Sequence, residues 1–176
     1  MSPVDFDASV LAWHDFYLAV AGASAALLGL LFVGVSINLA EMAAAERPGL
    51  RASASQAFAN LVNALALGLL MLVPNFDAPT MAAFFAAIAA LSLVRSLQHL
   101  VPVARAGSRP ERLRLLRRIG WPIAASLILG YVATVLWRTA DARALSLLVG
   151  VVLVLMIGAA QSSWDILVTA SRQPGD

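Results

Sequence analysis

The amino-acid sequence predicts an all-α, polytopic integral membrane protein with five transmembrane helices. Of its 176 residues, 61% are hydrophobic and only 12% are charged, whereas a soluble domain has about 25% charged residues. A chain of this size has too little core volume to hide so many apolar side chains from water. Five apolar stretches are each close to the ~20 residues that a helix needs to cross the hydrocarbon core. An open sheet in lipid would leave backbone groups unpaired, so each stretch is read as a helix.

The five predicted spans are joined by short connections, so we expect a single membrane domain over residues 1–176. The first span, FYLAVAGASAALLGLLFVGVSINLA, contains no charged residue. The third contains Arg95 close to its end, and the fourth has Pro122 in its first turn, where a missing N–H costs little. The predicted spans are 16–40, 57–73, 80–101, 119–137 and 144–169.

The distribution of arginine predicts the orientation of these spans. All 12 basic residues are arginine, and short connections rich in arginine stay in the cytoplasm. Arginines concentrate in the first and third connections, whereas the N-terminal segment and the second connection have none. We therefore predict a multi-pass protein of the cell inner (cytoplasmic) membrane with its N-terminus outside and its C-terminus inside.

The third connection has a pattern of its own. Ser108 and Glu111 fit a capping box, and Pro110 suits the start of a helix. The sequence predicts a short basic amphipathic helix here, and the 105–118 loop would contact anionic lipids of the inner leaflet. The alternative is that its arginines only set the topology. The arginines proposed to contact lipid are Arg112, Arg114, Arg117 and Arg118.

Polar residues gather at the predicted cytoplasmic ends of four spans. Ser92, Arg95 and Ser96 share one helical stripe in the third span. In the second span, the polar residues Gln56, Asn60 and Asn63 are spaced four and three residues apart and also share one stripe. One interpretation is that they only join helices by hydrogen bonds. The other is a polar, cytoplasm-facing vestibule, because ionisable residues inside membranes are often functional. The candidate residues are Asn38, Glu41, Gln56, Asn60, Asn63, Arg95, His99, Gln161 and Asp165.

Arg95 lies six residues before the predicted end of its span at residue 101, about 9 Å along the helix. It can therefore extend to the interface, or be held by Asp165 or Glu41. The outer half of the spans is almost purely apolar. A pathway through the protein would thus need a hydrophobic gate or an axis between subunits.

Small residues form one face of the first span. Gly22, Ala26, Gly29 and Ser36 lie near one side of that helix, and small faces let two helix backbones approach closely. The face would pack inside the protomer or form the seam of a homo-oligomer.

Several kinds of chemistry have no support in the sequence. There is no cysteine, so disulfides and thiolate sites are excluded. His14 and His99 lie on opposite sides of the membrane in the predicted topology, and we find no phosphate-binding loop or catalytic triad. We expect no enzymatic activity, no cofactor, no metal and no nucleic-acid partner.

The stretch FYLAVAGASAALLGLLFVGVSINL resembles small bacterial, actinobacterial-type integral membrane proteins of unassigned function. The resemblance covers the first span and implies a bacterial inner membrane. It implies no functional residue.

Two functions remain open on the sequence. The first is a homo-oligomeric protein that forms a channel or small-solute or ion pathway with a polar vestibule. The alternative is a non-transporting accessory or regulatory subunit that binds a partner membrane protein, for which a glycine-faced helix and a basic cytoplasmic segment would suffice.

Overall fold

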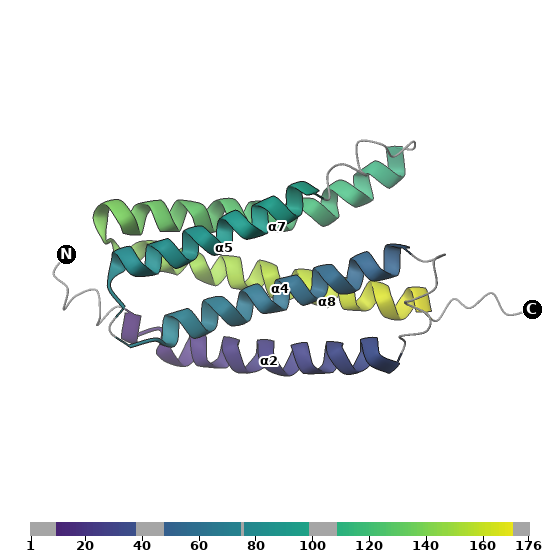
Figure 1. Ribbon diagram of the computed structural model, residues 1–176, viewed down its shortest axis with the longest axis horizontal. Coiled ribbons are helices and arrows are strands. Elements are labelled where there is room, and N and C mark those ends of the chain that lie inside the picture. The colour runs from purple at the N-terminus through teal and green to yellow at the C-terminus, as the bar shows by residue number, and fades with distance from the viewer. Residues whose placement is uncertain (1–9, 38–47, 75, 99–108, 171–176) are drawn as a thin grey trace, which may run out of the picture.

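Five long helices and one short 3₁₀ helix form the part of the chain that the computed structural model describes, residues 10–37, 48–74, 76–98 and 109–170 (Figure 1). No strand occurs within these ranges, and all five long helices are long and apolar enough to cross a membrane. The prediction of an all-α protein with five such helices is confirmed. The elements are α2 (His14–Ile37), α4 (Pro48–Leu72), α5 (Ala78–Gln98), α7 (Arg109–Thr139), η1 (Ala142–Leu145) and α8 (Ser146–Ala170).

The long helices run up and down along one axis, so α2 begins at one end of the bundle and α8 ends at the other (Figure 1). The end at which α4 and α7 begin carries Arg51 and Arg109 in its helices. We call it the basic end. The opposite end carries Asp15, Asp77 and Asp141. Which end faces the cytoplasm stays a prediction from the arginine distribution.

Two helices are longer than the apolar stretches that predicted them. α4 begins at Pro48, not at Ala57, because arginine and serine end an apolar run without ending a helix, and proline suits the first turn. α7 is one helix from Arg109 to Thr139. The predicted break between a short basic helix and a fourth span that starts near Pro122 is therefore wrong. Pro122 lies in the helix interior, where it removes one hydrogen bond from a helix long enough to keep the rest.

The helices pack as two groups (Figure 1). α4 lies between α2 and α8 and contacts both extensively, while α5 packs mainly along α7. α7 also contacts α8, but α4 and α5 touch only sparsely although they follow each other in the chain. We call the boundary between the α2–α4–α8 group and the α5–α7 group the seam. Large side chains with almost no exposed surface fill the core, among them Tyr17, Leu67, Met81, Phe85, Leu136, Leu145, Leu148 and Val152.

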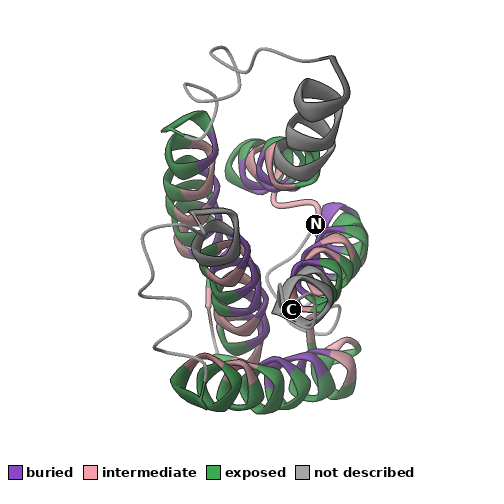
Figure 2. Ribbon diagram, turned by 90° about the vertical axis from the view of Figure 1, so that its right-hand side faces the viewer, coloured by how far each residue is buried: buried purple, intermediate pink, exposed green. Residues whose placement is uncertain are grey.

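Many residues on the outside of the bundle are exposed (Figure 2), and large hydrophobic side chains are among them. Leu30 and Phe32 of α2 are each 68% exposed, and Leu91 of α5 is 71% exposed. Monomeric soluble proteins rarely expose continuous apolar surface on this scale. The helices therefore suit a bilayer, and the protein is a multi-pass membrane protein.

The small face of α2 does not pack inside the protomer. A Cβ added at Gly22 or Gly29 would have no atom within 4 Å, and Ala26 and Ser36 are exposed. The expectation of packing within the protomer is therefore wrong for this face among the described residues. The close approach of backbones lies elsewhere, at Gly68 of α4, where an added Cβ would lie 3.1 Å from the Cβ and backbone N of Ala21.

Candidate functional site

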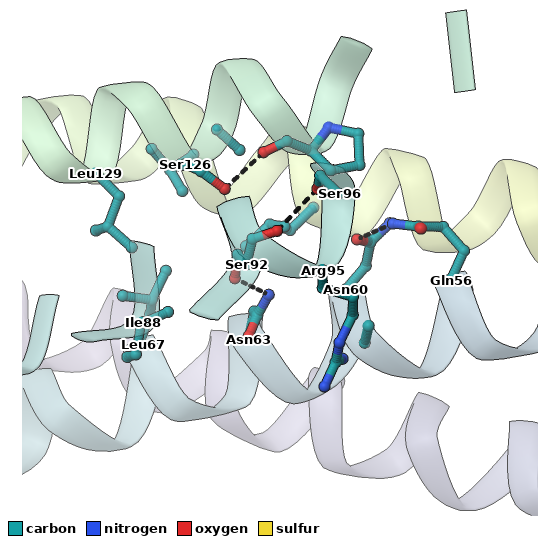
Figure 3. A pocket seen from close by; sticks show the side chains of 15 residues that line it. Gln56, Asn60, Asn63, Leu67, Ile88, Ser92, Arg95, Ser96, Ser126 and Leu129 are labelled. Carbon is teal, nitrogen blue, oxygen red and sulfur yellow. Dashed lines mark hydrogen bonds between the residues drawn. The ribbon is translucent and has the colours of Figure 1, made fainter. Parts of the chain in front are cut away.

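A small cavity with both polar and apolar side chains in its wall lies at the seam (Figure 3), and we call it the polar cavity. Arg95, in the last turn of α5, lies on its side towards the basic end. Four helices line the cavity, and the polar side chains come from α4, α5 and α7. Its volume of about 20 Å³ exceeds the ~10–15 Å³ that one water molecule needs. The lining polar residues are Gln56, Asn60, Asn63, Ser92, Arg95, Ser96 and Ser126; the apolar ones are Ala59, Leu67, Ile88, Pro122, Ala125, Leu129, Val151 and Leu155.

The α4 side of the cavity is an ordered polar stripe. The Gln56 Nε2 donates to Asn60 Oδ1 at 3.0 Å, one helical turn away. Asn60 is only 4% exposed, and its amide nitrogen lies where a Cβ on Gly158 of α8 would come within 2.8 Å. The absence of a side chain at Gly158 is therefore what lets Asn60 fit between α4 and α8.

One side-chain hydrogen bond crosses the seam within the described residues. Asn63 Nδ2 of α4 donates to Ser92 Oγ of α5 at 2.9 Å (Figure 3). Since α4 and α5 touch only sparsely, this bond is a principal specific link between them. The sequence placed Ser92 on the stripe of Arg95 but gave no signal for its partner, because helix periodicity does not tell which helices are neighbours.

Two further serines that line the cavity donate their hydroxyl protons to backbone carbonyls of their own helices. Ser96 Oγ donates to the Ser92 carbonyl and Ser126 Oγ donates to the Pro122 carbonyl, both at 2.8 Å. Such bonds to the carbonyl four residues earlier are common for serine within helices. Their oxygens keep acceptor capacity while their protons are used. Ser126 was missed by sequence reasoning, and the only signal for it was its place one turn after Pro122.

Arg95 is the only charged residue among the described residues that line the cavity. It lies at the edge of the cavity with an exposed side chain (Figure 3). Among the described side chains, none forms an ion pair or a hydrogen bond with its guanidinium. The predicted partners Asp165 and Glu41 lie outside the described side chains, so the pairing stays a prediction.

Some of the candidate residues predicted from the sequence have described side chains, and the side chains of the others lie outside what the structure describes. Gln161 of α8 is exposed and does not line the cavity, whereas the neighbouring Ser162 is buried and donates to the Gly158 carbonyl at 2.9 Å. The structure thus brings together Gln56, Asn60, Asn63 and Arg95. Asn38, Glu41 and His99, and the side chains of Asp165, Arg112, Arg114, Arg117 and Arg118, lie outside what the structure describes.

Beyond the cavity, towards the opposite end, the core is closed by apolar side chains. Phe85 and Val152 have no exposed surface, and Val151 and Leu129 separate the cavity from them. The buried hydroxyls of Tyr17 and Ser24 on α2 have no hydrogen-bond partner among the described residues. No continuous polar path therefore crosses the described part of the bundle.

Catalytic geometry is not evident in the described part of the chain. The exposed His14 Nδ1 and Asp15 Oδ1 lie 3.3 Å apart near the start of α2. No group of three histidine, aspartate or glutamate side chains comes together as a metal site among the described residues. Among the described residues, the polar cavity is thus the place where polar side chains and a charged residue come together. The chain matches no family model, no curated protein and no solved structure, so its resemblance to small bacterial membrane proteins stays an expectation.

Proposed function

We propose that this protein is a homo-oligomeric protein of the bacterial inner membrane that forms a gated channel or pathway for a small polar solute or ion. The polar cavity at the seam is the inner end of that pathway, and it opens towards the cytoplasm. The observation that carries the proposal is the convergence of polar side chains from three helices on one cavity inside an otherwise apolar bundle.

Structural hydrogen bonding alone explains only part of this cluster. The Asn63–Ser92 bond does join two helices, and such bonds contribute about 0.6 kcal/mol on average. Joining helices requires neither a cavity nor an arginine at its edge. Ionisable groups within membrane spans are costly and usually serve a pathway or a ligand.

The seam provides the gate of the proposed pathway. Because α4 and α5 touch only sparsely, α5 can move away from α4 at the loss of few contacts, while α7 keeps its packing against α8. Such a movement would break the Asn63–Ser92 bond and part the apolar side chains beyond the cavity. A hydrophobic constriction closes a pore by excluding water, so the conformation described above corresponds to a closed state.

The direct test is flux through proteoliposomes, with a pair of neighbouring phenylalanines as variant and control. Phe85 is fully buried, one turn beyond the cavity residue Ile88, whereas Phe84 is 45% exposed on the surface. Phe85→Ala should increase the release of small ions or solutes, because it thins the apolar barrier, and Phe84→Ala should not. Both variants must elute like the wild type in detergent.

The test covers a monovalent anion, a monovalent cation and a small neutral solute in turn. If neither the wild type nor Phe85→Ala releases any of them faster than protein-free vesicles, the pathway proposal is wrong.

The alternative function, an accessory subunit for another membrane protein, is favoured by the outward face of α2. Gly22 and Gly29 present open space there, and small residues allow another helix to approach closely. A second copy of this chain and a different membrane protein both fit that face. The flux measurement separates the alternative from the pathway, because an accessory subunit transports nothing alone.

A further inference from the structure

We infer that the cavity at the seam binds one small monovalent anion, with Arg95 supplying the positive charge. The use of that site for transport rests on the proposed function, whereas the binding itself does not. The inference stands on the charge, the hydrogen-bond donors and the size of the cavity.

The charge of the lining excludes a cation as the preferred ligand. Among the described residues that line it, Arg95 is the only ionisable one, and none is an aspartate or glutamate. The sequence places no acidic residue within 53–73, 78–98, 120–139 or 143–164. Aspartates with described side chains lie at the opposite end of the bundle. The guanidinium of Arg95 therefore gives the edge of the cavity a positive charge, which attracts an anion.

The hydrogen bonds leave donors for that anion. Asn63 gives one of its two N–H groups to Ser92 Oγ, so its second N–H and the hydroxyl proton of Ser92 remain to be donated. The Arg95 guanidinium adds donors with full charge. The three groups come from two helices on the two sides of the seam, so an anion between them would also hold the seam closed.

The volume limits the size of the ligand. A space of about 20 Å³ accepts one particle close to the size of a water molecule. A single halide ion suits this space with little widening, and a small planar anion such as nitrate fits only if the seam widens. A divalent anion would leave one charge uncompensated, because the lining offers a single cation.

The test measures the thermal unfolding of the full chain in a neutral detergent by circular dichroism. Sodium chloride replaces sodium gluconate stepwise at constant ionic strength, because gluconate is too large for the cavity. The wild type should gain stability along a saturating curve, since a ligand that binds only the folded state raises the unfolding temperature.

Three variants locate the effect. Arg95→Gln should weaken the apparent affinity for chloride about tenfold or more, because it removes a charge-assisted hydrogen bond. Arg95→Lys, which keeps the charge, should retain a saturating response. Arg138→Gln is the matched control, because it removes an exposed arginine at the opposite end of the bundle and should leave the response unchanged.

Other outcomes overturn the inference. An equal response in Arg95→Gln and the wild type would mean a general salt effect. A response to sodium at constant chloride would mean a cation site. Stabilisation by anionic phospholipid with no response to chloride in its absence would mean that Arg95 binds a lipid phosphate.

Flux in vesicles separates this inference from the proposed function. Saturable chloride binding without any flux contradicts the pathway and keeps the anion site. Flux of cations or neutral solutes without chloride binding contradicts the anion site and keeps the pathway.

Discussion

Replacing Gly68 by alanine should destabilise the bundle, although the same change at Gly29 should not. An added Cβ at Gly68 would lie 3.1 Å from both the Cβ and the backbone N of Ala21, and 3.2 Å from its Cα. Carbon atoms prefer separations of about 3.5–4.0 Å. The neighbouring atoms include helix backbone, so α2 and α4 must move apart by a few tenths of an ångström to admit the methyl group.

The magnitude follows from two opposing effects. Overpacking of this kind costs about 1–3 kcal/mol, whereas alanine favours the helix over glycine by about 0.8–1.0 kcal/mol. At Gly29, where a Cβ meets nothing within 4 Å, only the second effect operates. The unfolding free energies of Gly68→Ala and Gly29→Ala should therefore differ by about 1–3 kcal/mol, with Gly68→Ala the less stable.

The assay is reversible unfolding by sodium dodecyl sulfate in mixed micelles, followed by far-ultraviolet circular dichroism. The comparison of two glycine-to-alanine variants cancels the common change in helix propensity. Equal stabilities would show that α2 and α4 do not meet at Gly68 and Ala21, and the packing of α2 described above would then be wrong.

Three further predictions test topology, assembly and the environment of Arg95. A cysteine at Asp77 should react with a membrane-impermeant thiol reagent in whole cells, and a cysteine at Ser108 should not; labelling at position 108 would reverse the orientation. Gly29→Leu should unfold like the wild type but elute as a smaller species if α2 joins copies of the chain, and an unchanged elution profile removes α2 from any subunit interface. If Arg95 binds an anion and not Asp165, the loss of stability in the double variant should equal the sum of the losses in Arg95→Ala and Asp165→Ala, within about 0.5 kcal/mol. A double variant that recovers part of the loss would instead pair the two residues and contradict the anion site.

The number of helices and their approximate bounds could be predicted because lipid acts on every span in the same way. A run of about 20 apolar residues is a strong signal, and it correctly predicted α2, α5 and α8. The signal fails where a helix continues beyond the hydrocarbon. α4 includes Arg51 and begins at Pro48, and α7 continues through Pro122, so polar or proline residues ended the predictions and not the helices.

The packing faces could not be predicted for a related physical reason. In water, the buried side of a helix is the apolar side, whereas in lipid both sides are apolar and burial leaves little trace in the sequence. Gly22 and Gly29 therefore looked like contact residues and face outward, while Gly68 and Gly158 make the close contacts. The polar residues were more informative: the stripe of Gln56, Asn60 and Asn63 does line the cavity. Its partner Ser92 required knowledge of which helices are neighbours.

The division of the bundle at the seam has a consequence for how the chain is made. α2 and α4 are consecutive and pack together, as are α5 and α7, so each pair can form a hairpin as soon as its second helix enters the membrane. The two hairpins touch little until α8 arrives, because α8 contacts both α4 and α7. Until then, the amide nitrogen of Asn60 lacks Gly158, the α8 residue that it packs against. The arrival of α8 thus joins the two hairpins into one bundle, and a chain truncated after Thr139 would lack the helix that holds them together.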